Sequence, residues 1–370
     1  MRVTQPAVLV GPYDWDATLI PAAEFTGRIK EVWQKLGSTG LAGLIVYGNK
    51  MDNAALAYLT NFTPKIQDGY ALVAPDGSVR LHSAGSPHMM VNAQRLTWVD
   101  AVKPIRDIGK HIGEWAEGLG QGPLGLWATP TMGNDQINRI ANANPARPIK
   151  DVSATLDPLL LPKTGVAGKV MRDASGILSK GTAALRQAFK SGATAREAAV
   201  AAEKAAADAN ASDVRVLVSL SPGGTPTAID YPQGGRLDPL LAYIAVRYGG
   251  YWADGALTLS SSPSDTLKRS EAGLQAMIEK ARAGVAVADL AATARDKLGG
   301  LTVHPAAKKV ASGIGLSLEE TEAGGVVRLE AGRIYTLRAG ALASKTDNAL
   351  LSAMIKPKAN GAEILWSSLA

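Results

Sequence analysis

Cysteine is absent from this chain of 370 residues. Its absence excludes disulfide bonds, thiolate nucleophiles and thiolate metal sites. It does not identify a cellular compartment, because secreted proteins can also lack cysteine.

Histidine is scarce. The four histidines are His82, His88, His111 and His304, so none lies between residues 112 and 303. A mechanism that needs a pair of histidines in the C-terminal half is therefore disfavoured.

Long apolar runs are also missing. The longest fall far short of the ~18–20 residues that a membrane-spanning helix needs, and the N-terminus Met-Arg-Val-Thr-Gln-Pro does not resemble a signal peptide. We therefore expect a soluble, cytoplasmic protein with no membrane partner.

The charge pattern gives no sign of a nucleic-acid site. The net charge is +6, but Lys and Arg are scattered and form no stripe with interleaved aromatic residues. No Walker motif, Gly-x-Gly-x-x-Gly after a strand, or Gly-x-Ser-x-Gly occurs, and Ser221-Pro222-Gly223-Gly224 has the composition of a turn. We expect neither a nucleic-acid partner nor a nucleotide cofactor.

Length and composition indicate two globular domains. The chain is 46% hydrophobic and 19% charged, which is typical of a folded protein. Residues 1–22 are expected to form an arm. Residues 23–160 alternate between helical and strand patterns (helices 23–36 and 52–59, strand 43–47, hairpin strands 70–74 and 78–82), which predicts an α/β domain.

Residues 156–163 contain two prolines, Pro158 and Pro162, which predicts a linker there. Residues 161–370 then show a mixed α+β pattern: a long helix from Val166, an Ala-rich helix capped at 193–197, a strand at 214–220, helices near 268–283 and after 283, and strands within 325–366.

The segment 240–258 carries the most specific motif. It resembles the signature Asp-x-Gly-x-x-x-x-Gly-Tyr-x-x-Asp of the creatinase/aminopeptidase P/prolidase family, the M24 peptidases with the pita-bread fold. Gly250, Tyr251 and Asp254 match this signature, whereas Tyr243 replaces its first aspartate. The segment 58–62, Tyr-Leu-Thr-Asn-Phe, is similar to the Tyr-Leu-Thr-Gly-Phe of the family's N-terminal domain.

The resemblance spans residues 25–366 in matching order. It implies a creatinase-like α/β N-terminal domain, a pita-bread α+β C-terminal domain and a homodimer. Enzymes of this family hold two divalent metals with Asp, Asp, His, Glu and Glu, and the metals activate a bridging water.

Most of these ligand positions are altered here. The first aspartate is Tyr243, the second is Asp254, the histidine is Ser312, and the first glutamate is Arg338. The last glutamate falls within 346–352, where Asp347 is the one carboxylate. An arginine does not lose its proton in proteins and would repel a metal, so we expect no metal and no other cofactor.

The resemblance also assigns candidate residues for a ligand. Asp230 takes the place of the family histidine in Pro-His-Tyr, which serves as the acid/base in creatinase, a metal-free member. Tyr243, Asp254 and Arg338 are the further catalytic candidates. The candidates for substrate binding are His304, Ser312, Glu319, Glu320 and His88.

Two interpretations of Arg338 remain open: a structural ion pair with Asp254, or a bidentate contact to a ligand carboxylate. Three functions remain open as well. The first is a metal-free protein that hydrolyses or binds a small amide, peptide or guanidino compound in a cleft between the domains. The second is an inactive pseudo-peptidase that acts as a binding protein, and the third is a metallo-aminopeptidase of the Xaa-Pro type.

Overall fold

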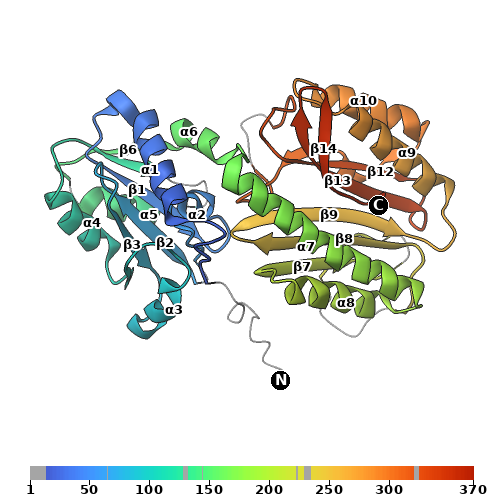
Figure 1. Cartoon of the computed structure of the whole chain (residues 1–370), viewed down its shortest axis with the longest axis horizontal. Helices are drawn as coiled ribbons and strands as arrows, with labels where there is room; N and C mark the ends of the chain where they lie inside the picture. The colour runs from blue at the N-terminus through green and yellow to red at the C-terminus, as the bar shows by residue number, and fades with distance from the viewer. Residues whose placement is uncertain are drawn as a thin grey trace. The chain divides into compact units, whose positions relative to one another are not determined.

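The structure, a computed structural model, describes residues 14–64, 66–127, 132–143, 145–221, 224–228, 235–320 and 325–370. The chain forms two compact units, an N-terminal unit up to Leu161 and a C-terminal unit from Pro162 (Figure 1). Each is described separately below.

The N-terminal unit contains a six-stranded mixed sheet with the order β4-β3-β2-β1-β5-β6. Strands β1, β5 and β6 are parallel, as are β3 and β4, while β1-β2-β3 form an antiparallel meander. The strands are β1 Gly43–Asn49, β2 Asp68–Val73, β3 Val79–Ser83, β4 Val102–Pro104, β5 Leu124–Trp127 and β6 Ile149–Asp151. The helices are α1 Ala22–Leu36, α2 Ala54–Thr60, α3 Met90–Gln94, α4 Ile108–Glu117, α5 Asn134–Ala143 and α6 Ser153–Leu156.

The predicted linker begins in helical structure. Residues Asp157–Leu160 form a 3-10 helix directly after α6, with Pro158 in its first turn. Proline is tolerated there because the amide hydrogen that it lacks would have no partner within the helix. The expected arm, residues 1–22, is described only from Asp14 onward.

Two histidines of the N-terminal unit stack in its interior. The rings of His82 on β3 and His111 on α4 lie 4.6 Å apart at 29°. His82 is 3% exposed, and its Nδ1 has no hydrogen-bond partner among the described residues. Burial, with smaller contributions from His111, Lys103 and Arg80, lowers the pKa of His82 to about 4.

This low pKa predicts that acid destabilises the protein through His82. An unfolded histidine takes up a proton below about pH 6.5, whereas folded His82 does so only near pH 4. The free energy of unfolding should therefore fall as the pH drops from about 6.5 to 4, by at most about 3 kcal/mol. Urea unfolding across this range should show the loss in the wild type and in His88→Gln, which changes an exposed histidine. An equal loss in His82→Gln would assign the effect to other groups.

The C-terminal unit is built on two antiparallel sheets. One has the order β7-β8-β9 and the other β10-β12-β13-β14, with β11 paired to β12. The strands are β7 Asp213–Val218, β8 Leu240–Tyr248, β9 Tyr251–Leu259, β10 Thr302–Val303, β11 Ala311–Gly313, β12 Tyr335–Leu342, β13 Asn348–Lys358 and β14 Gly361–Ser367. The helices are α7 Gly165–Lys190, α8 Ala195–Asp208, α9 Asp265–Lys280 and α10 Val287–Leu298.

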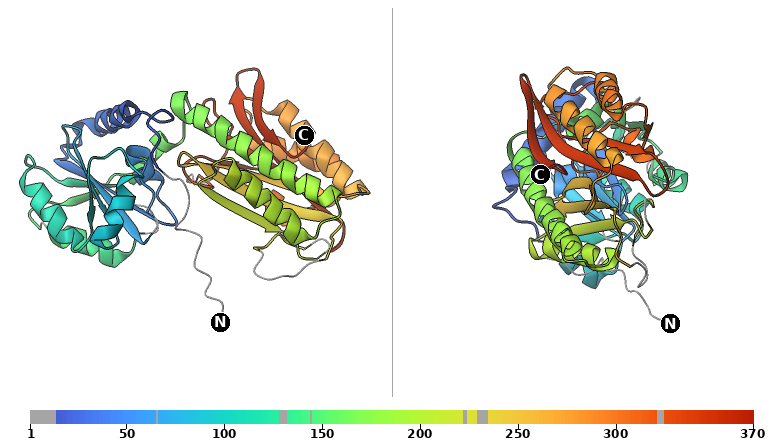
Figure 2. Two further views of the ribbon diagram at one scale, coloured as in Figure 1. Left: turned by 60° about the horizontal axis from the view of Figure 1, so that its bottom comes forward. Right: turned by 90° about the vertical axis from the view of Figure 1, so that its right-hand side faces the viewer.

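The helices cover one face of each sheet. Helices α7 and α8 lie against β7-β8-β9, and α9 packs on β12 and β13 with α10 beside it (Figures 1 and 2). The predicted cap of the Ala-rich helix is confirmed: Thr194 and Glu197 form a reciprocal capping box at the start of α8. In the described part of the chain, no helix is long and apolar enough to cross a membrane.

A tight hairpin sets the register of β8 and β9. The connecting residues Gly249 and Gly250 have φ values of 53° and 83°, a conformation that glycine adopts without steric cost. The turn pairs Tyr248 with Tyr251 and therefore Ala245 with Asp254, and Tyr243 with Ala256. Because side chains alternate along a strand, Tyr243 and Asp254 point to the same face.

The opposite face of this hairpin is closed by α7 and β14. A Cβ atom on Gly255 would lie 2.4 Å from the Trp366 indole, so only glycine leaves room for this ring. The Trp366 Nε1 donates to Thr182 on α7 over 3.3 Å. The face that carries Tyr243 and Asp254 is called the inner face below, and the face against α7 the outer face.

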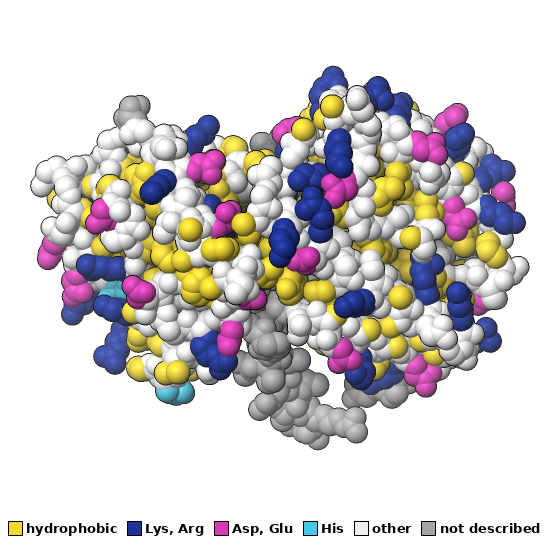
Figure 3. Space-filling model, in the orientation of Figure 1, with side chains coloured by type: hydrophobic (Ala, Val, Ile, Leu, Met, Phe, Trp, Pro, Cys, Tyr) yellow, Lys and Arg dark blue, Asp and Glu magenta, His cyan; other side chains and the backbone are white. Residues whose placement is uncertain are grey.

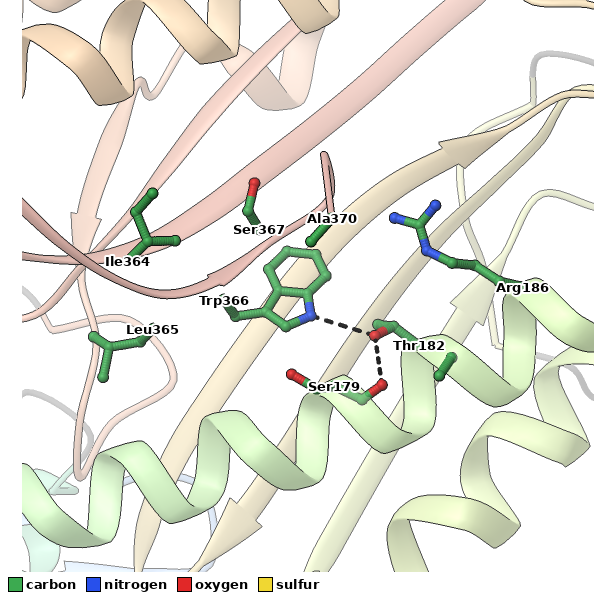
Figure 4. A pocket seen from close by; sticks show the side chains of 9 residues that line it. Ser179, Thr182, Arg186, Ile364, Leu365, Trp366, Ser367 and Ala370 are labelled. Carbon is green, nitrogen blue, oxygen red and sulfur yellow. Dashed lines mark hydrogen bonds between the residues drawn. The ribbon is translucent and has the colours of Figure 1, made fainter.

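A groove with a volume of about 430 Å³ runs along the outer face. It is lined by Ser179, Thr182, Ala183 and Arg186 of α7 and by 364–367 and Ala370 (Figure 4). Because Trp366 packs on Gly255, this groove lies across β9 from Asp254 and is not part of the predicted site.

Candidate functional site

Asp254 is the centre of a hydrogen-bonded cluster on the inner face. Its side chain is 1% exposed. Tyr243 on β8 and Arg338 on β12 both donate to Oδ2, over 3.1 and 3.0 Å, and Thr336 donates to Oδ1 over 2.5 Å. One donor on β8 and two donors on β12, a strand of the other sheet, thus satisfy one buried carboxylate.

Arg338 joins Asp254 to Ser312. Its Nη2 pairs with Asp254, and its Nη1 donates to the Ser312 hydroxyl over 2.6 Å. The Arg338 side chain is 13% exposed, so it is not fully enclosed. Of the two interpretations of Arg338, the ion pair with Asp254 is present in the structure.

Strand pairing explains why these residues converge. Ser312 on β11 lies opposite Thr336 on β12, and Arg338 follows Thr336 by two residues, so all three share a face. Thr336 was not singled out from the sequence. Its position two residues before Arg338 on a strand would have placed it beside that side chain.

Tyr243 is a hydrogen-bond donor with a raised pKa. Burial and the nearby negative charge of Asp254 both raise the pKa of its phenol, while Arg338 and Arg215 oppose the rise. The phenol therefore keeps its proton at neutral pH and donates a hydrogen bond to Asp254.

The donor set does not fit a pair of divalent metals. At the four positions aligned with family ligands stand a phenol, one carboxylate, a hydroxyl and a guanidinium, and both oxygens of that carboxylate accept hydrogen bonds. In the described ranges, no group of three or more His, Asp or Glu side chains could hold a metal ion. A two-metal site needs several anionic ligands.

Asp347 does not supply a fifth ligand. It accepts hydrogen bonds from Ser264 and Thr266 at the start of α9, both over 2.7 Å. Within the window 346–352, Ser352 is the residue that pairs with Arg338, and its hydroxyl bonds to the Ala256 amide over 2.7 Å. Asp347, the one carboxylate of this window, is thus a partner of the α9 N-terminus.

Glu319 and Glu320 have different environments, although both were predicted to contact a ligand. Glu319 is exposed and forms an ion pair with Lys309. Glu320 is buried, and its carboxylate lies 2.6 Å from Lys163 Nζ, with the two side chains 5% and 1% exposed. Glu320 is thus held in a buried ion pair, and the ligand contacts of both glutamates stay predictions.

His304 is buried and hydrogen-bonded, and its ligand contact stays a prediction. It is 6% exposed, and its Nδ1 accepts a hydrogen bond from the Ala306 amide at the start of a 3-10 helix. Burial lowers its pKa, so the ring is neutral at neutral pH. His88 is exposed on the N-terminal unit beside Ser86, and its ligand contact stays a prediction. Asp230 lies outside the described residues.

Comparison with known proteins supports the fold. The sequence profile described as metallopeptidase family M24 matches residues 169–363, more than half of the chain. No curated protein matches the sequence.

Several solved structures are similar over almost the whole chain. The X-Pro aminopeptidase from Thermotoga maritima MSB8 has 17% identity and a TM-score of 0.73, with 91% of this chain and 97% of that chain covered. The prolidase from Pyrococcus horikoshii OT3 has 18% identity and a TM-score of 0.71, with 92% and 97% covered. The Xaa-Pro dipeptidase from Bacillus anthracis has 18% identity and a TM-score of 0.69, with 93% and 97% covered. The predicted fold class, an α/β domain followed by a pita-bread α+β domain, is confirmed.

Proposed function

This chain belongs to metallopeptidase family M24, as its motifs indicated, and from that premise we propose that its inner face binds a small peptide or amide without a divalent metal pair. The proposal is supported above all by one observation, the Arg338 guanidinium 3.0 Å from Asp254. A guanidinium stays charged in proteins, so it repels a cation from the carboxylate that remains.

The chemistry of the cluster favours binding over proton transfer. Asp254 already accepts hydrogen bonds on both oxygens, and Tyr243 keeps its proton, so neither is poised as a general base. Two hydrogen bonds, to Ser312 and Asp254, use only part of the five N–H donors of Arg338. The remaining donors suit a carbonyl or carboxylate oxygen of a ligand.

The positive charge of Arg338 limits the class of ligand that the inner face can bind. Of the ligand classes that the sequence left open, a guanidino compound would bring a second cation to Arg338 and is disfavoured. A peptide or an amide that carries a carboxylate is favoured, and the solved relatives named above for X-Pro substrates make Ala-Pro a suitable first probe.

We expect the purified protein to bind Ala-Pro and to hold no stoichiometric divalent metal. Elemental analysis after dialysis should give far less than one transition-metal ion per chain. Isothermal titration with Ala-Pro should give the same dissociation constant with and without EDTA, because no metal contributes to the site. About two metal ions retained per chain would restore the metallo-aminopeptidase function.

The same protein should not hydrolyse Ala-Pro. Metal-free turnover would instead favour the alternative derived from the sequence, in which Asp230 is the acid/base. In that case Asp230→Asn should lower the rate by about 10²–10⁴-fold. If the Asp230→Asn variant still hydrolyses Ala-Pro, the protein is not a binding protein without activity, and Asp230 is not its acid/base.

A further inference from the structure

The groove on the outer face of the C-terminal unit combines an apolar wall with a single cation. Its volume of about 430 Å³ lies within the range of ~300–1,000 Å³ that is typical of small-molecule sites. The apolar wall is formed by Ala183 of α7 and by residues 364–366 of β14 (Figure 4). Ile364 is 51% exposed, so a large aliphatic side chain of this wall faces solvent.

Arg186 is the one charged side chain among the described residues that line the groove. It is half-buried, and its Nη2 donates to the carbonyl oxygen of Ser368. Burial lowers its pKa and the charge of Glu271 opposes this, but no carboxylate in the described part of the chain forms an ion pair with Arg186. A guanidinium has five N–H donors and does not lose its proton in proteins. The groove therefore carries one positive charge whose other donors are free for a ligand.

The cation and the exposed apolar side chain lie at opposite ends of the groove. Figure 4 shows Arg186 at one end and Ile364 at the other, with Trp366 between them. Along α7, the helix rises by ~10 Å between Ser179 and Arg186. Trp366 already donates its indole N–H to Thr182, so the middle of the groove offers apolar contact and no free indole donor. A ligand that fits has an anionic head and an apolar body, with a total length of ~10 Å.

An added peptide strand is a poorer fit. Among the described strands, β14 is at the edge of its sheet, and an open edge can pair with an extended peptide. The register between β13 and β14 shifts between Met354 and Ile355, so Leu365 is an extra residue with no partner on β13. A bulge of this kind twists the edge and interrupts the row of backbone groups that a new strand would need.

The single positive charge also selects the head group. A carboxylate carries one negative charge, and its two oxygens match the guanidinium fork of Arg186 with parallel hydrogen bonds. A phosphate monoester carries about −1.5 to −2 charges at neutral pH. Part of that charge would remain uncompensated in a half-buried site, which is costly. The groove therefore favours a carboxylate over a phosphate.

We propose that this groove binds a medium-chain aliphatic carboxylate, with the carboxylate on Arg186 and the alkyl chain running past Trp366 to Ile364. The site goes beyond the function proposed for the inner face, from which β9 separates it. The alkyl chain removes the exposed apolar wall from water, and the carboxylate neutralises the half-buried cation. A neutral or cationic ligand would satisfy only the first of these two requirements.

The test uses octanoate as the probe and octanamide, which has the same chain without the charge, as the neutral control. In isothermal titration of the full chain, octanamide should bind about 10- to 100-fold more weakly than octanoate, since the charge-assisted contact is missing. In protein labelled with ¹⁵N-tryptophan, octanoate should shift the Nε1–H signal of Trp366, which Trp366→Phe assigns. This signal reports on the groove because the indole lines it.

Two substitutions on α7 test the head and the chain separately. Arg186→Gln should weaken octanoate binding about 10- to 100-fold and leave octanamide unchanged, whereas Arg186→Lys should stay within ~10-fold of the wild type because it keeps the charge. Ala183→Trp should abolish the binding of both, because the indole fills the groove. The matched controls are Arg295→Gln on α10 and Ala207→Trp on α8, which are exposed positions outside the groove lining and should change neither affinity.

Each contrary result overturns a defined part of the proposal. Equal affinity for octanoate and octanamide, or unchanged octanoate affinity in Arg186→Gln, overturns the carboxylate anchor. Binding that survives Ala183→Trp, or that leaves the Trp366 signal in place, overturns the groove as the site. Tighter binding of hexyl phosphate than of octanoate overturns the choice of head group, and no saturable binding of octanoate overturns the proposal as a whole. Ala-Pro binding to the inner face should be the same in Ala183→Trp and in the wild type, so the two sites are tested independently.

Discussion

Replacing Arg338 with alanine is expected to lower the free energy of unfolding by about 3–5 kcal/mol. The substitution removes the cation that lies 3.0 Å from Asp254 and leaves a carboxylate that is 1% exposed. Tyr243 and Thr336 would still donate hydrogen bonds to it, but neither supplies a charge. Urea unfolding of the wild type and the variant at pH 7 measures the difference.

Two controls make this result specific. The double variant Arg338→Met/Asp254→Asn removes both charges and should recover most of the loss, because the penalty comes from an unpaired buried charge. Arg172→Ala breaks the ion pair with Glu363, whose side chains are 51% and 25% exposed, and should cost at most about 1 kcal/mol. If Arg338→Ala lowers the free energy of unfolding no more than Arg172→Ala does, Arg338 is not the group that neutralises the buried Asp254 carboxylate.

The sequence predicted the inner face because local patterns determine it. Gly249 and Gly250 set the hairpin, strand alternation then brings Tyr243 and Asp254 to one side, and the order of motifs identifies the strand of Arg338. The predicted helices and strands agree with the structure to within a few residues for the same reason: their apolar periodicity and caps are visible over short stretches.

Features that depend on tertiary contacts were not predictable in this way. No sequence pattern links Lys163 to Glu320, or places Asp347 at the start of α9, because each contact joins distant segments. The scattered charges of the sequence do correspond to the surface that Figure 3 shows, where the Lys and Arg side chains of the visible described residues are interspersed with Asp and Glu.

Two glycines close to Ser312 show the same dependence on tertiary contacts. Gly313 and Gly315 follow Ser312, which takes the place of the family's metal-binding histidine. In the structure, a Cβ atom on Gly315 would lie 2.0 Å from Lys163 Cε, and one on Gly313 would lie 3.0 Å from Glu320 Oε2. The buried ion pair leaves no room for a side chain at Gly315 and little room at Gly313, so the presence of these glycines gives no information about metal binding.

Breaking the buried ion pair of Lys163 and Glu320 is expected to have the second large effect on stability. Lys163→Met is expected to lower the free energy of unfolding by about 3–5 kcal/mol, because the Glu320 carboxylate would lose the cation 2.6 Å away in a site where it is 5% exposed. The double variant Lys163→Met/Glu320→Leu replaces both charges with apolar side chains and should recover most of that loss.

The neighbouring pair of Lys309 and Glu319 supplies the matched control. Its side chains are 46% and 48% exposed, so Lys309→Met should cost at most about 1 kcal/mol. Urea unfolding of all three variants and the wild type gives the comparison. The Arg333 guanidinium and the Glu320 carboxylate lie 3.2 and 3.0 Å from the point that a Gly313 Cβ would occupy. If Lys163→Met costs as little as Lys309→Met, then Arg333, and not Lys163, neutralises Glu320, and Arg333→Met should show the large loss in its place.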